Sequence, residues 1–286
     1  MHYLNKKITY HQILFLCLSL VIILSYSGNI ESDYLMAFNL PSPIFWSFVM
    51  IATLGMGHGA LDGKIIWDST NNRVSKLKIY CIYIGIVMFG LVLWFVSPFI
   101  SLIILLFMSL VHFGESDMQG YKTTKFENIY WGIIVTLIPV VFKIEEVNNI
   151  FLQLAGLQIN PLIYSLIVII FLFAILFWSK ILFQKKLFLL GVSLSIMMLA
   201  GYLLHPLVWF AYYFCFFHGM KAIINYSINL KLDILWMLLF TAPVLLVWGY
   251  LAFFTNISII LFIFPTLFAL TIAHMMLKNI MKKVLV

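Results

Sequence analysis

Stretches of about twenty apolar residues follow one another along almost the whole chain, and a helical stretch needs roughly 17 to 25 residues to cross the hydrocarbon core of a bilayer. The composition agrees, because 64% of the residues are hydrophobic and only 9% are charged, whereas soluble domains carry about a quarter charged residues. We therefore expect an all-α integral membrane protein, a polytopic bundle of transmembrane helices. The ten runs that could form spans cover residues 11–29, 42–61, 79–97, 99–116, 128–143, 161–179, 187–204, 206–222, 232–254 and 257–277.

The number of spans is open between eight and ten. The fifth run is short and contains Pro139, and two of the breaks between runs are tight. The first run has a basic N-terminal flank, as signal peptides do, but a retained first helix is favoured because more spans follow. No soluble domain or repeat interrupts the pattern, so residues 1–286 predict a single integral membrane domain.

The basic residues predict the orientation, because short loops that are rich in Lys and Arg stay on the cytoplasmic side. With ten spans and both termini in the cytoplasm, all 17 basic residues except Lys143 fall on that side. The net charge of +7 then reflects topology and contact with anionic lipid headgroups, not a nucleic-acid surface. We expect a multi-pass protein of the cell inner membrane with the lipid bilayer around it and no nucleic-acid partner.

Four histidines share one depth in this arrangement. His58, His112, His218 and His274 stand on four different runs, each one helical turn before the first charged residue at the cytoplasmic end. Histidine inside a span marks a functional site by default, although any one of them could simply form a hydrogen bond between helices. Independent structural histidines have no reason to share a level. The four together therefore predict a metal site.

The ligand type narrows the choice of metal. Neutral imidazoles suit iron, zinc, copper and nickel, and an all-nitrogen site with open positions fits Fe(2+) that activates dioxygen. Asp62, Glu115 and Asp117 follow two of the histidines and could orient them by accepting the second ring N–H. The same acids could instead be interfacial charges that cap the spans, and both interpretations remain open. Glycines on both sides of His58 permit close helix approach or a non-helical turn.

The residues around the histidines form four short segments: His58-Gly-Ala-Leu-Asp62, His112-Phe-Gly-Glu-Ser-Asp117, Tyr213-Phe-Cys-Phe-Phe-His218 and Thr271-Ile-Ala-His274-Met. In order and spacing, over about residues 50–280, they resemble the signature segments of the Brp/Blh family of membrane β-carotene 15,15′-dioxygenases. The resemblance implies an iron-dependent oxidoreductase that uses O₂ to split the central double bond of β-carotene into two molecules of retinal, usually for a microbial rhodopsin. It also implies that His58, His112 and His218 are iron ligands.

The chain departs from the family pattern after His218. The family typically has a second histidine four residues later, where this chain has Ala222, and it usually has Pro where this chain has Ala273. Either His274 completes a four-histidine set, as its depth suggests, or the site has three ligands and the chemistry is altered.

Aromatic residues gather near the third histidine. A carotenoid is a long apolar rod that dissolves in the bilayer, so an enzyme for it should admit substrate from lipid and line a tunnel with aromatic side chains. Tyr213, Phe214 and Phe217 are the candidates for this lining. Aromatic residues in spans more often serve lipid-facing packing, so their presence permits a tunnel without showing one.

Other functions also fit a membrane bundle with histidines. A haem-binding electron carrier pairs histidines as axial ligands, but such pairs often lie on the same helices, whereas each histidine here has its own. A transporter needs polar residues along the whole bundle, and this chain is polar at one end. A divergent family member that no longer cleaves its substrate is a further alternative, because of Ala222.

Overall fold

The computed structural model of the protein describes residues 2–27, 34–35, 40–55, 57–225, 230–254, 258 and 260–285. Almost all of them are helical, because only internally hydrogen-bonded segments can sit in hydrocarbon. The exceptions with regular structure are two short strands, β1 (Tyr34–Leu35) and β2 (Leu40–Pro41), which pair antiparallel. The all-α prediction is confirmed in the described part of the chain.

The helices of the first half are α1 (His2–Ser27), α2 (Ser42–Met50), the π-helix η1 (Ile51–Gly55), α3 (Gly57–Asp68), α4 (Arg73–Val96), α5 (Pro98–Asp117) and α6 (Lys125–Phe142). Those of the second half are α7 (Ile144–Ala155), α8 (Pro161–Gln184), α9 (Phe188–Leu203), α10 (Pro206–Tyr212), the π-helix η2 (Tyr213–Gly219), α11 (Met220–Asn225), α12 (Leu230–Phe254) and α13 (Ile260–Leu285).

Seven segments among the described residues are long and apolar enough to cross a membrane: α4, α5, α6, α8, the continuous stretch from α10 through η2 into α11, α12 and α13. Residues 9–23 of α1 and all of α9 are apolar but shorter. Each of the ten predicted runs contains helix, but the second is divided into α2, η1 and α3. The count of ten spans is therefore not confirmed.

Helix α7 is absent from the sequence prediction, which placed a loop there. Val147, Ile150, Phe151 and Leu154 recur at helical spacing and form its buried face. Two glutamates in the first turn suit the positive end of the helix dipole, and the helix ends at Gly156, which has φ +63°. With 12 residues, α7 is too short to cross a bilayer, so the length criterion for spans does not detect it.

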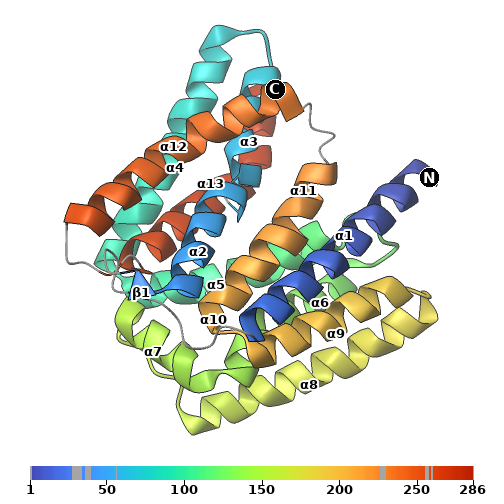
Figure 1. Ribbon diagram of the computed structural model, residues 1–286. Coiled ribbons are helices and arrows are strands. Elements are labelled where there is room, and N and C mark those ends of the chain that lie inside the picture. Colours follow the sequence, from blue (N-terminus) through green and yellow to red (C-terminus); the bar gives the residue numbers. More distant parts are fainter. Residues whose placement is uncertain are drawn as a thin grey trace.

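The helices pack in pairs: α4 lies along α13, α5 along α6, and α12 along α3 (Figure 1). The α5–α6 pair is especially close, because a Cβ atom on Gly132 would lie 1.9 Å from the main-chain oxygen of Leu110. Small residues allow such approach between helices in a membrane. The close contact lies next to the C-terminal half of α5, which carries His112 and Asp117.

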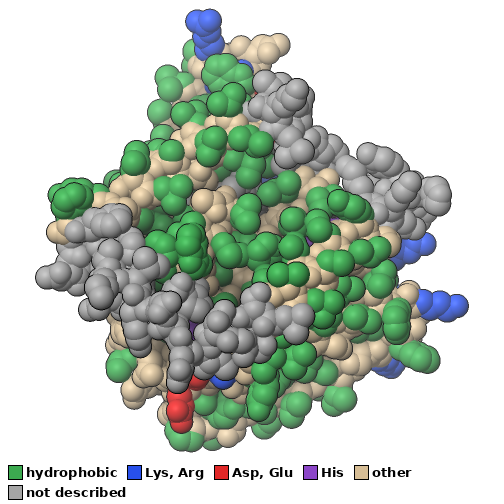
Figure 2. Space-filling model, in the orientation of Figure 1, with side chains coloured by type: hydrophobic (Ala, Val, Ile, Leu, Met, Phe, Trp, Pro, Cys, Tyr) green, Lys and Arg blue, Asp and Glu red, His purple; other side chains and the backbone are tan. Residues whose placement is uncertain are grey.

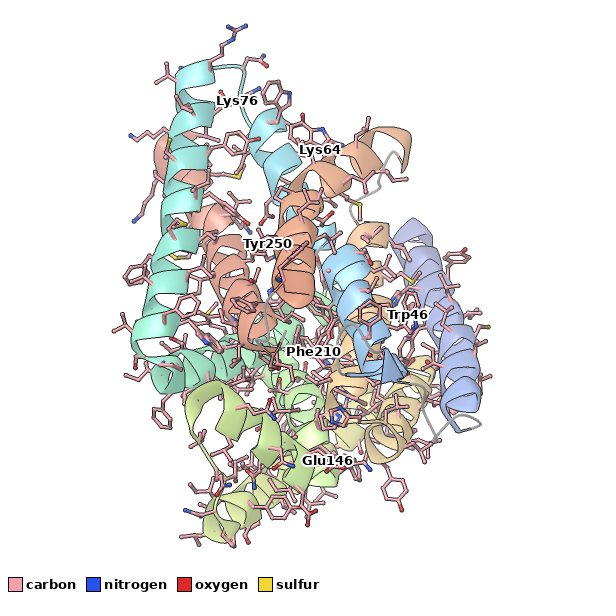
Figure 3. The ribbon with its side chains drawn as sticks, turned by 60° about the vertical axis from the view of Figure 1, so that its left-hand side comes forward. Trp46, Lys64, Lys76, Glu146, Phe210 and Tyr250 are labelled. Atoms are coloured by element: carbon pink, nitrogen blue, oxygen red, sulfur yellow. The ribbon has the colours of Figure 1, made fainter. Side chains whose placement is uncertain are left out.

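The charged residues mark the two ends of the bundle. Lys64 and Lys76 lie toward one end and Glu146 lies at the opposite end (Figure 3). The face between them is covered mainly by apolar side chains (Figure 2). This distribution agrees with the orientation predicted from the basic residues, with the lysine end in the cytoplasm.

Candidate metal centre

An apolar cavity of about 360 Å³ lies inside the bundle. Its lining on α13 extends from Phe264 to His274, which is about 15 Å along a helix. His112 also lines it, and so do Val147 and Phe151 of α7, near the end of the bundle opposite the lysine end (Figure 3). The cavity is therefore elongated along the bundle, with two of the predicted histidines in its wall.

Three predicted histidines come together from three different helices. His112 of α5 and His218 of η2 have their Nε2 atoms 3.2 Å apart, and their ring centroids are 4.9 Å apart. The ring of His274, on α13, lies 5.3 Å from that of His112 and nearly perpendicular to it. His218 does not line the cavity and stands behind His112.

The fourth histidine, His58, belongs to α3, but its side chain lies outside the described residues. Its surroundings are described. Gly55, Gly59 and Asp62 line the same cavity as His112. The segment that carries His58 therefore passes along the wall of the cavity.

Asp117 is buried at the end of α5 and holds His218. Its Oδ1 lies 2.8 Å from Nδ1 of His218, and its Oδ2 accepts hydrogen bonds from Tyr213 at 2.5 Å and Trp131 at 2.9 Å. Lys221 donates to the main-chain oxygen of the same residue. These donors compensate a charge that would be costly in hydrocarbon. The bond to Nδ1 leaves Nε2 of His218 facing His112.

Asp62 holds His274 in the same way. Both of its carboxylate oxygens lie 2.9 Å from Nδ1 of His274, and Tyr83 of α4 donates to Oδ2 at 3.0 Å. The Asp62 side chain is 2% exposed, while 28% of the His274 side chain remains accessible, as expected for a ring in a cavity wall. Asp62 and His274 are 212 positions apart, so the pair also joins α3 to α13.

The third acid, Glu115, is exposed at the surface and does not reach these histidines. Its neighbour Asp117 points inward, because two residues on a helix differ in direction by about 200°. Of the three acids proposed to orient ligands, Asp62 and Asp117 therefore lie at the centre, and Glu115 is in the position expected of an interfacial charge.

The aromatic residues divide between two faces of the α10–η2 segment. Tyr213 and Phe214 line the cavity, whereas Phe217 is buried elsewhere, against Phe15 and Trp131. On the cavity face, Phe214 stacks on the ring of His218 at 5.8 Å with an interplanar angle of 9°. The aromatic face thus continues directly into the histidine cluster.

Two π-helical segments meet at this point. Gly55, the last residue of η1, packs against the ring of Phe214, to which a Cβ atom would approach within 2.5 Å. Gly55 therefore allows the close approach expected of the glycines near His58. At Gly59, by contrast, no atom lies within 4 Å of the position that a Cβ atom would take. Single π-helical turns are frequent at functional sites, because they rotate side chains out of the ordinary helical order.

Lys221 is a buried cation beside the centre. Its side chain is 2% exposed, and its Nζ lies 4.4 Å from the ring centroid of Tyr121, in cation–π contact. Tyr121 belongs to the loop after α5, where burial and the nearby Asp117 charge raise the pKa of its hydroxyl. From the sequence alone, Lys221 is only one of the basic residues that predict the orientation of the chain in the membrane. The structure makes it part of the polar network around Asp117.

The donor set fits a metal ion by chemistry. Two imidazole nitrogens that bind one ion at about 2.1 Å are separated by about 3.0 to 3.4 Å, which includes the 3.2 Å between His112 and His218. Within the described residues, no group of three or more His, Cys, Asp or Glu side chains is already arranged to hold a metal. A third and a fourth nitrogen would have to come from His274 and His58.

Comparison with known proteins relates the sequence of this chain to one enzyme family. A family model described as beta-carotene 15,15'-dioxygenase matches residues 49–282, which include His58, His112, His218 and His274 as well as Asp62 and Asp117. The curated beta-carotene 15,15'-dioxygenase of uncultured marine bacterium 66A03 is 26% identical over 252 residues, covering 81% of this chain and 91% of that protein. No solved structure matches the chain.

Proposed function

Because this chain belongs to the family of β-carotene 15,15′-dioxygenases, we propose that it cleaves β-carotene, or a related carotenoid, with dioxygen to give retinal. Each carbon of one double bond receives one oxygen atom of O₂, so the reaction needs no further reductant. The observation that carries the proposal is the elongated apolar cavity with His112 and His274 in its wall. Its shape and lining suit a rod-shaped hydrocarbon.

Ferrous iron is the cofactor of this proposal, and His58, His112, His218 and His274 would hold it. When bound, iron supplies the one-electron and O₂ chemistry that the cleavage requires. Asp117 and Asp62 hold the Nδ1 protons of His218 and His274, which keeps the Nε2 lone pairs available. Ala222 contributes no ligand, so His274 takes the place of the family's additional histidine.

The remaining residues of the site position the substrate. The aromatic faces of Tyr213 and Phe214 border the cavity next to the histidines and would orient the polyene there. The apolar side chains of α7 line the outer part and exclude water from it. The chain thus supplies orientation and a dry chamber.

The surroundings of the protein fit a carotenoid substrate. Large apolar side chains are exposed over much of the bundle, so a carotenoid dissolved in the bilayer can reach it without crossing water. In this proposal the substrate enters from the lipid of a cell inner membrane. Retinal released into the same membrane would be available to a microbial rhodopsin.

Expression in a bacterium that accumulates β-carotene tests the proposal. We expect loss of the carotenoid, formation of retinal measured by chromatography, and iron in the purified protein without a haem Soret band. The proposed function would be contradicted if the protein is inserted into the membrane but leaves β-carotene intact and carries no iron. A Soret band would favour the haem-binding electron carrier, and a bound but uncleaved carotenoid would favour a non-cleaving family member.

A further inference from the structure

The buried carboxylates of Asp62 and Asp117 each have a histidine and a tyrosine as neighbours. Asp117 lies between Nδ1 of His218 and the hydroxyl of Tyr213, and Asp62 lies between Nδ1 of His274 and the hydroxyl of Tyr83. Tyr213 and His218 both belong to η2, whereas Tyr83 belongs to α4 and His274 to α13. The centre therefore contains two parallel His–Asp–Tyr chains, each ending in a histidine of the candidate metal centre.

We propose that Tyr83 is a positioning residue, and that it holds Asp62 in the orientation in which the carboxylate anchors His274. Tyr213 plays the corresponding part for Asp117 and His218. This inference rests on the proposed function, because fixing the ring of His274 matters only if its Nε2 has to point at a metal ion. Neither tyrosine needs to touch the metal for this role.

The role follows from the acceptor capacity of a carboxylate. An ionised Asp has about four lone-pair directions and no donor, so in hydrocarbon it must be satisfied by donors from several sides. One N–H of His274 satisfies only part of Asp62. If the hydroxyl of Tyr83 were absent, the carboxylate would be free to take up a proton or to turn toward the metal. Either change would release Nδ1 of His274.

Tyr83 also connects a third helix to the Asp62–His274 pair. It belongs to α4, whereas Asp62 belongs to α3 and His274 to α13. The side chain lines the same cavity as His274. A sequence analysis has no means to select it, because it is one of 14 tyrosines in the chain.

The same helix provides a matched control. Tyr80 lies three residues before Tyr83 and also lines the cavity, but its hydroxyl donates to the main-chain oxygen of Gly63 at 2.5 Å. Tyr83→Phe and Tyr80→Phe each remove one hydroxyl from the same wall. Only the first removes a bond to a carboxylate that anchors a histidine.

Purified wild-type protein and both variants are loaded with Fe(2+), and retention of iron is measured against a chelator. We expect Tyr83→Phe to weaken iron binding by about 10-fold, as loss of an outer partner of a metal ligand does, and Tyr80→Phe to leave iron binding unchanged. With β-carotene, Tyr83→Phe should lower kcat and leave KM nearly unchanged. Tyr213→Phe should weaken iron binding in the same direction as Tyr83→Phe.

A double variant separates positioning from a general structural effect. If Tyr83 acts through Asp62, adding Tyr83→Phe to Asp62→Asn should weaken iron binding no further than Asp62→Asn alone. The inference is overturned if the two losses add, if Tyr83→Phe and Tyr80→Phe bind iron equally well, or if Tyr83→Phe raises only KM. Wild-type protein that neither binds iron nor cleaves β-carotene would overturn the proposed function instead.

Discussion

His112 and His218 are 106 positions apart in the chain, and their Nε2 atoms lie 3.2 Å apart. Nδ1 of His218 is occupied by Asp117, so only its Nε2 is directed at His112. Two imidazoles with this separation in an apolar bundle can share one proton or one metal ion. The second arrangement lets both rings remain neutral and use their lone pairs.

Replacement of His112 or His218 by Ala should remove iron from the purified protein and abolish retinal formation. The same loss is expected for His58→Ala. The variants should still insert into the membrane, because one side chain contributes little to the free energy of inserting many apolar helices. Iron content, retinal yield and the membrane fraction are measured together. Full activity in any of the three variants would refute the metal-centre assignment.

His274→Ala should lose iron as completely as His112→Ala does, if His274 takes the place of the histidine missing at position 222, as proposed. Ala222→His should then add little in the wild-type background. If His274→Ala keeps iron and activity, or if Ala222→His raises activity sharply, the centre has three histidine ligands and His274 serves packing. Iron content of both variants decides between these outcomes.

Asp117→Asn should weaken iron binding by roughly 10- to 100-fold, because the amide cannot accept from His218, Tyr213 and Trp131 as the carboxylate does. Glu115→Gln removes a carboxylate two residues away at the exposed surface and should leave iron binding unchanged. Chelator competition compares the two. Equal losses in both variants would mean that the charge of this helix end matters and the hydrogen bonds of Asp117 do not.

Gly132→Ala should destabilise the protein strongly, because its new Cβ would overlap the main-chain oxygen of Leu110 and force α5 away from α6. Overpacking of this kind costs about 1 to 3 kcal/mol or more. Gly85→Ala is the control, since nothing lies within 4 Å of a Cβ there. Thermal unfolding in detergent should show a lower Tm for the first variant only. An unchanged Tm would mean that the two helices can separate without cost.

The sequence allowed the helical class, the orientation and the histidine depth to be predicted, because hydropathy and charge act on each residue almost independently of the tertiary fold. His112, His218 and His274 could be grouped for that reason. Tyr83 and Trp131 could not, since their roles depend on how α4 and α6 rotate about their own axes. The depth of a residue follows from counting along a span, whereas the direction of a side chain depends on packing against helices that are distant in the sequence.

The π-helical turn of η2 determines the direction in which His218 points. Such a turn holds one residue more than the α-helical path that it replaces, and each residue of an α-helix advances by about 100°. If the same residues followed an α-helical path instead, His218 would turn away from His112, although every residue type in the segment stayed the same. The backbone path of this segment is thus as much a part of the site as its histidine.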